Sequence, residues 1–265
     1  MTDLYRASRA AEQAAYAAGT HLQASRSRLS ATMVTHEDPG DVVHSIDQEV
    51  QSMIREVVLR QFPQHDFRSE RGTSESTPVT PRDRPTWVVD PINGLANYRR
   101  GYPQYAVSIA LIEAGEPQLG VVYDPSRNEF FGAIRGQGAV LNGAAIQCAR
   151  PRPPIEALAA TVFPKPTSAC MPGYVTEFGR VVRAFSGVRR SGSMALELAY
   201  LSASRIDAFW EHEVSGSEFA AGIVLLRESG ALIHARDGRA LLASQSLLAC
   251  TPQLFEPFLS MLAEG

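Results

Sequence analysis

The sequence predicts two structural halves, an α+β half over residues 1–150 and an α/β half over residues 151–265. Two amphipathic stretches come first, and from Thr86 on they are followed by short apolar runs separated by turn residues. After the proline-rich segment 151–156, short apolar runs alternate with helical stretches. We therefore expect a boundary between residues 148 and 156.

Two helices are expected at the N-terminus. Residues 4–29 and 45–61 have apolar side chains at helical spacing. Between them, Pro39-Gly40 predicts a turn, because neither residue favours a helix interior. That turn would leave three acidic side chains on a loop: Glu37, Asp38 and Asp41.

An antiparallel meander is expected next, with the helices stacked on one face of its sheet. The strand signals are short runs rich in β-branched and aromatic residues, separated by turn formers such as Asn142-Gly143. These runs cover residues 86–89, 105–113, 119–123, 129–134 and 139–143.

The second half is expected to alternate strands and helices. Strand-like runs occur at residues 160–163, 188–190, 207–210, 231–235 and 246–250. Helical stretches occur at residues 174–184, 193–202 and 218–229, and a last helix closes the chain.

Charge and hydropathy narrow the partners. Lys and Arg number 25 against 28 for Asp and Glu, and no basic run offers a contact surface for nucleic acid or an anionic membrane. No apolar stretch approaches the roughly 18 to 20 residues of a spanning helix. The polar N-terminus lacks the apolar core of a secretory signal, so a cytoplasmic protein is expected.

Cysteine and histidine spacing excludes two classes of site. Cys148, Cys170 and Cys250 are widely spaced, so reduced, buried thiols are expected instead of a disulfide framework. The six histidines show no HExxH spacing, which argues against a zinc site built from histidines.

The densest polar cluster is WVVDPINGLANY, residues 87–98. An apolar strand that ends in Asp90 and runs into a glycine-containing turn delivers a carboxylate and the Asn93 side chain at a strand end. The amides of Gly94 and Leu95 would then be available to an anion. The segment predicts a metal and phosphate site, while an ordinary β-turn with Asp and Asn as turn formers remains the alternative.

Residues 90–98, Asp-Pro-Ile-Asn-Gly-Leu-Ala-Asn-Tyr, resemble the signature Asp-Pro-Ile-Asp-Gly-Thr-x-Asn-Phe of the inositol monophosphatase family. Further landmarks of that family follow the same order along the whole chain. They are Asp41 in DPGDVV, Asp47 in HSIDQEV, Glu70 in FRSERG, Gly192-Ser193 in RRSGSMALELAY, Glu211 in DAFWEHE, and SEFAAGIVLLRESGALI at 217–233.

The resemblance implies a layered αβαβα sandwich of the inositol monophosphatase and fructose-1,6-bisphosphatase type, a homodimer, Mg²⁺ as cofactor and a small phosphorylated sugar or polyol as substrate. Carboxylate and carbonyl oxygens are the ligands that Mg²⁺ prefers. By this resemblance the metal set is Glu70, Asp90, the Ile92 carbonyl, Asn93 and Glu218. The catalytic positions are Asp47, Glu70 and Leu95, and the substrate positions are Gly94, Leu95, Gly192, Ser193 and Glu211.

Two of these positions have other interpretations. Ser193 begins an expected helix and is also explained as a plain N-cap. Glu211 is also explained as a solvated strand end.

Several residues depart from the family pattern. Asn93 replaces an Asp and removes one negative charge from the expected metal site. Leu95 replaces a Thr, and its side chain can neither donate nor accept a hydrogen bond. Ser217-Glu218 stands where Trp-Asp is usual. The first hypothesis is therefore a Mg²⁺-dependent phosphomonoesterase with weakened metal binding, acting on a sugar, inositol or nucleotide-derived phosphate. The alternative is an impaired or repurposed homologue that binds such a ligand or catalyses another reaction on it.

Overall fold

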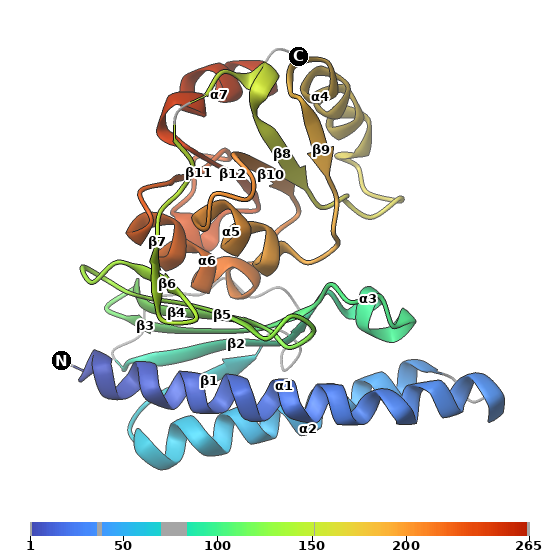
Figure 1. The fold of residues 1–265 in the computed structure, drawn as a ribbon, viewed down its shortest axis with the longest axis vertical. Coiled ribbons are helices and arrows are strands. Elements are labelled where there is room, and N and C mark those ends of the chain that lie inside the picture. Colours follow the sequence, from blue (N-terminus) through green and yellow to red (C-terminus); the bar gives the residue numbers. More distant parts are fainter. Residues whose placement is uncertain (1, 36–38, 70–83, 151, 264–265) are drawn as a thin grey trace.

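The computed structural model describes residues 2–35, 39–69, 84–150 and 152–263. These residues form five layers, which confirms the expected αβαβα sandwich (Figure 1). The layers are the helix pair α1 and α2, a seven-stranded sheet, the helix pair α5 and α6, a five-stranded sheet, and the helix pair α4 and α7.

The first layer consists of α1 (Leu4–Thr35) and α2 (Pro39–Gln61). Small side chains on one face of α1, among them Ala7, Ala11 and Ala18, are completely buried, so this helix lies close to its neighbours. No helix in the described part of the chain is long and apolar enough to cross a membrane.

The expected loop at Pro39-Gly40 is wrong. Pro39 is the first residue of α2, a position where the missing N–H group costs nothing. Asp41 lies in the first turn of α2, where a carboxylate is favoured by the positive end of the helix dipole. Glu37 and Asp38 lie outside the described residues.

The seven-stranded sheet follows chain order from β1 to β7. Strands β2 to β7 form the expected antiparallel meander, whereas β1 pairs in parallel with β2 and was not predicted. The strands are β1 (Asp66–Ser69), β2 (Thr86–Asn93), β3 (Ala106–Glu113), β4 (Glu116–Asp124), β5 (Glu129–Ile134), β6 (Ala139–Leu141) and β7 (Ala144–Ile146).

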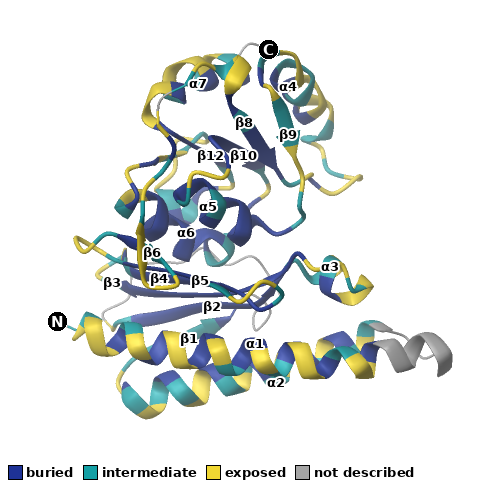
Figure 2. Ribbon diagram, in the orientation of Figure 1, coloured by how far each residue is buried: buried dark blue, intermediate teal, exposed yellow. Residues whose placement is uncertain are grey.

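Helices cover both faces of this sheet, so the expectation that they stack on one face is wrong. In β3, Val107, Ile109 and Leu111 belong to the core shared with α1 and α2. The intervening Ala106 and Ala110 belong to the core shared with α5 and α6. A strand buried on both faces has a nearly continuous apolar sequence, as β3 does (Figure 2).

The second half contains the expected alternation of strands and helices. Its five-stranded sheet has the order β11-β12-β10-β8-β9, with β8 parallel to both β9 and β10. The elements are β8 (Leu158–Thr161), α4 (Met171–Ala184), β9 (Gly187–Arg189), α5 (Met194–Ser202), β10 (Ala208–His212), α6 (Gly216–Glu228), β11 (Leu232–Ala235), β12 (Ser246–Cys250) and α7 (Phe255–Ala263).

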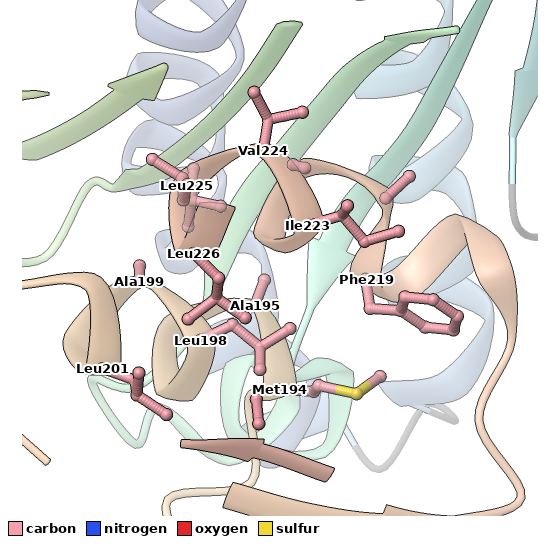
Figure 3. Packing of buried hydrophobic residues seen from close by; sticks show 14 of the residues in the cluster. Met194, Ala195, Leu198, Ala199, Leu201, Phe219, Ile223, Val224, Leu225 and Leu226 are labelled. Atoms are coloured by element: carbon pink, nitrogen blue, oxygen red, sulfur yellow. The ribbon is translucent and has the colours of Figure 1, made fainter. Parts of the chain in front are cut away.

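The middle layer joins the two sheets. Apolar side chains of α5 and α6 interlock there, including Leu198 and Leu226 (Figure 3). A Cβ atom on Gly120 of β4 would lie 2.3 Å from the Ala221 carbonyl oxygen, so α6 rests directly on the backbone of that strand. The expected boundary at 148–156 stays a prediction.

The cysteines carry free thiols, as expected. Only Cys250 is buried, however, while Cys148 and Cys170 are half-buried.

Candidate functional site

The candidate site begins where β2 ends. All eight residues of β2 are buried, and its pairing with β3 is regular up to Asp90 and shifts register before Asn93. The irregularity contains Pro91, which has no N–H group for a sheet ladder. Such bulges redirect side chains next to active sites, and this one lies between Asp90 and Asn93.

A tight turn follows. Gly94 has φ of 94° and precedes the short helix α3 (Leu95–Arg100). A Cβ atom at this residue would lie 2.8 Å from the Gln104 carbonyl oxygen. Both the left-handed backbone and the close approach therefore require glycine. The expected metal and phosphate segment thus has a turn at Gly94, while Asp90 and Asn93 belong to the strand.

The Asn93 side chain connects the two halves of the chain. Its Oδ1 atom accepts hydrogen bonds from Ser193 Oγ at 2.7 Å and from the Ala195 amide at 2.9 Å. Its Nδ2 atom donates to Asp90 Oδ2 at 2.9 Å. Ser193 is the N-cap residue of α5, but its hydroxyl makes no capping hydrogen bond to that helix. The plain N-cap interpretation of Ser193 is therefore incomplete.

A second set of contacts fixes the loop before α5. Asn97 Nδ2 donates to the carbonyl oxygens of Gln104 at 2.7 Å and Ser191 at 2.8 Å. The Ser191 amide donates to Glu197 Oε1 at 2.9 Å. Between these contacts, Gly192 has φ of 84°, and a Cβ atom there would lie 3.0 Å from Asn97 Nδ2. The expected substrate residues Gly192 and Ser193 are therefore held beside the end of β2.

The expected metal ligands are only partly brought together. Asp90 is 3% exposed, and Ile92 lies in the irregular end of β2. Glu218 lies in the first turn of α6, where its Oε2 atom accepts the Ser215 amide at 2.9 Å. Glu70 lies outside the described residues. Among the described residues, no three His, Cys, Asp or Glu side chains form a group that holds a metal.

The donor chemistry fits one hard cation better than several. Asp90 and the Ile92 carbonyl supply the oxygen atoms that Mg²⁺ prefers. Asn93 does not fit as a ligand, because a carbonyl oxygen has two lone pairs and Asn93 Oδ1 already accepts two hydrogen bonds.

The two expected catalytic residues beside the metal set come from different elements. Asp47 is buried in α2, a helix that packs against β2 and α3. Leu95 is the first residue of α3, and its half-buried side chain packs against the core under α1 and α2. Leu95 therefore has a packing role that its sequence position did not reveal.

Glu211 lies on β10 and is 3% exposed, so its interpretation as a solvated strand end is wrong. Its carboxylate accepts the amides of Val162 at 2.6 Å and His212 at 2.9 Å. Burial raises the pKa of Glu211 to about 8 although these two amides oppose the shift. The positive charge of Arg190 also lowers the pKa of Glu211, without a hydrogen bond. The Arg190 guanidinium lies 4.7 Å from the centre of the Phe163 ring.

A profile of the inositol monophosphatase family matches residues 3–264. The chain belongs to this family. It is 32% identical over 250 residues to the Nus factor SuhB of Pasteurella multocida, covering 94% of this chain and 92% of that protein. It is 34% identical over 227 residues to the inositol-1-monophosphatase of Mesorhizobium japonicum, covering 85% and 84%.

Solved structures agree with this assignment. The inositol monophosphatase of Anabaena (Nostoc) sp. PCC 7120 has a TM-score of 0.82 and 31% identity, and the match covers 98% of this chain and 96% of that one. Phosphatase activity is the activity of the inositol monophosphatase family. Some relatives are named Nus factors, and the expectation that nucleic acid is not a partner stays a prediction.

Sequence reasoning missed two residues of the candidate site. Asn97 was quoted within the family signature without a role, and its hydrogen bond to Ser191 joins the two halves. Glu197 is 1% exposed, and a buried acid within a helical apolar run is the signal that could have indicated it.

Proposed function

We propose that this member of the family is a Mg²⁺-dependent phosphomonoesterase acting on a small sugar, inositol or nucleotide-derived phosphate. The observation that carries the proposal is the buried Asp90 at an irregular strand end, linked through Asn93 to Ser193 of the expected substrate loop. This arrangement supports a metal-activated phosphate next to a polyol pocket. Binding of such a ligand between the two halves is consistent with where these residues lie.

The roles of the residues follow from their chemistry. Asp90 and the Ile92 carbonyl would hold the metal, with Glu70 and Glu218 in the positions that the family resemblance gives them. A bound Mg²⁺ supplies charge stabilisation for a phosphoryl group and its leaving oxygen. Asp47 is proposed as the proton acceptor for the attacking water, and the amides of Gly94 and Leu95 are proposed to donate to the phosphate. The buried Glu211 is proposed to accept a hydrogen bond from a substrate hydroxyl.

Metal stoichiometry tests the first part of this proposal. Because Asn93 Oδ1 is occupied by two internal hydrogen bonds, we expect at most one tightly bound Mg²⁺. Calorimetric titration of the wild type measures the number of sites. Two or three tight sites in the unmodified chain would contradict this expectation.

A substitution at Leu95 tests the proton transfer to Asp47. A threonine there would supply a hydroxyl that passes a proton toward Asp47, so Leu95→Thr should raise kcat by about 10- to 100-fold with little change in KM. Release of inorganic phosphate from a panel of phosphate esters at several Mg²⁺ concentrations measures both constants. If kcat and ligand affinity are unchanged, Leu95 has no part in the reaction and serves packing alone.

A second candidate function is a homologue that binds a phosphorylated ligand without hydrolysing it. It is favoured by the two hydrogen bonds that Asn93 Oδ1 accepts from Ser193 and Ala195. An oxygen atom that already accepts two hydrogen bonds is not available to bind a catalytic metal. The double variant Asn93→Asp/Leu95→Thr separates the two candidates in the same phosphate-release assay. Turnover by the wild type supports the phosphatase, whereas turnover by the double variant alone supports the binding protein.

The proposed oligomer is a homodimer, by analogy with the family. Light scattering in solution measures the mass directly, and a mass near that of one 28.8 kDa chain would reject the dimer.

A further inference from the structure

We propose that Asn93 is a positioning residue that joins the end of β2 to the start of α5 without a metal ion. In this role Asn93 also donates to Asp90, a contact that a carboxylate at the same place could not make. The role does not require hydrolysis, so it stands or falls separately from the proposed phosphatase activity.

The first step concerns the direction of the three hydrogen bonds. Asn93 accepts twice through Oδ1, from Ser193 Oγ and the Ala195 amide, and donates once through Nδ2, to Asp90 Oδ2. An amide side chain is able to do both, because it carries a carbonyl oxygen and an NH₂ group. A carboxylate has the same shape but only accepts. Aspartate could therefore keep the two contacts to α5 and would lose the contact to Asp90.

The second step concerns charge. Asn93 is 4% exposed and Asp90 is 3% exposed, so neither side chain can turn its polar atoms to solvent. The two polar atoms that meet are 2.9 Å apart. Two carboxylates at such a distance in a buried site repel each other, and a cation between them removes that repulsion. With asparagine at 93, one of these negative charges is absent and the amide hydrogen satisfies the Asp90 oxygen.

The third step concerns what the connection holds. Ser193 and Ala195 lie at the first turn of α5, directly after the loop that Asn97 and Glu197 fix through Ser191. The hydrogen bonds of Asn93 and Asn97 therefore lock one substrate loop of the second half onto the first half. We infer that this loop is ordered before any metal binds, and that position 93 serves loop placement in this chain.

Thermal unfolding of three proteins, each with EDTA and with saturating Mg²⁺, tests the proposal. With EDTA, Asn93→Asp should melt about 5 to 10 °C below the wild type, because it loses a buried hydrogen bond and gains a like charge. Mg²⁺ should restore most of that loss and raise the wild type by less. Asn93→Ala should melt below the wild type in both conditions, because it keeps none of the three hydrogen bonds, and Mg²⁺ should raise its melting temperature no more than it raises that of the wild type.

A nearby residue provides a matched control. Asn97→Asp makes the same chemical change in the same inter-half connection, but Asn97 donates to two backbone carbonyls and not to a carboxylate. Its loss of stability should therefore be the same with EDTA and with Mg²⁺. Recovery of Asn97→Asp by Mg²⁺ to the extent seen for Asn93→Asp would overturn the proposal.

A double-mutant cycle covers the case in which Asn93→Asp does not fold without metal. Ser193→Ala removes the partner of Asn93 Oδ1 and should lower the melting temperature in the wild type but much less in Asn93→Ala. Additive losses would overturn the proposal, as would an Asn93→Asp protein as stable as the wild type in EDTA. Phosphate release by the wild type, measured on the same preparation, reports on the proposed activity independently of these results.

Discussion

Glu177 and Glu211 are two buried glutamates of the second half with opposite surroundings. Glu177 on α4 pairs with Arg236 Nη2 at 2.6 Å and with His212 Nε2 at 2.9 Å. Glu211, the residue before His212 on β10, has only backbone amides and the Thr161 hydroxyl within hydrogen-bonding distance among the described residues. Burial by itself raises the pKa of a carboxyl, and the partners decide whether that effect prevails.

The two pKa values differ accordingly. Burial alone would raise the pKa of Glu177, but the hydrogen bonds from His212 and Arg236 outweigh it and hold that pKa below its ordinary value. For Glu211, burial prevails and the pKa rises to about 8. Removing the cation from a paired buried acid leaves an uncompensated charge and destabilises the fold, whereas a buried acid without a hydrogen-bonded cation is a candidate for ligand binding. The comparison therefore separates a paired structural acid, Glu177, from Glu211, the acid that we propose binds substrate.

The largest expected effect comes from breaking the ion pair of Glu177. Arg236→Ala leaves a buried carboxylate with His212 as its remaining side-chain partner. We expect a loss of about 3 kcal/mol in the free energy of unfolding, or roughly 6 to 9 °C in the melting temperature. Urea unfolding at pH 7 measures it.

The control is an exposed pair. Arg60→Ala removes the partner of Glu56 within α2, where both side chains are largely exposed, and should cost less than about 0.5 kcal/mol.

Unfolding at low pH provides a second check, because the folded pKa of Glu177 lies below the ordinary value of 4.5. Its contribution is therefore complete above that pH and is lost as the pH falls through the folded pKa. Equal losses of unfolding free energy in Arg236→Ala and Arg60→Ala would show that the buried and the exposed ion pair contribute alike.

A different pH dependence is expected at Glu211. Its folded pKa is raised, so its contribution to stability is complete below about pH 4.5 and is lost as the pH rises through about 8. Glu211→Gln cannot ionise, and from pH 5 to pH 9 its melting temperature should rise relative to the wild type by roughly 3 °C or more. Any constant penalty for the substituted amide leaves this slope unchanged. A difference that is flat with pH would place Glu211 with the paired acids.

The smallest expected effect concerns Arg190, the cation that lowers the pKa of Glu211 without a hydrogen bond. Arg190 is exposed, so solvent and salt weaken its action. Arg190→Gln should move the midpoint of the Glu211 pH dependence upward by less than about half a pH unit, and added salt should reduce this shift. A shift above one unit would show that Arg190 pairs directly with Glu211 in solution.

The sequence predicted the elements well where local pattern decides them. The signature at 87–98 predicted the strand that leads into Asp90 and the turn at Gly94, because these depend on neighbouring residues. It did not predict the partners of Asn93 and Asn97, which lie about a hundred residues away in the loop before α5 and in its first turn. The strand β1 was not predicted because its sequence, Asp-Phe-Arg-Ser, is short and polar.

The helix start at Pro39 was also missed, because proline both breaks helices and begins them. The roles assigned to Asp47, Glu70 and Leu95 came from the family resemblance and stay predictions. Glu70 lies outside the described residues.

The close packing of α6 on β4 limits which substitutions the two elements accept. Gly120 and Gly222 leave no space for an added methyl group, since one would meet the Ala221 backbone and the other the Leu198 side chain. Glu218 and Ala221 belong to the same helix, so whatever pushes Ala221 also moves Glu218 as part of a rigid rod. Gly120 in the neighbouring layer therefore limits where the Glu218 carboxylate, about one helical turn from Ala221, can lie.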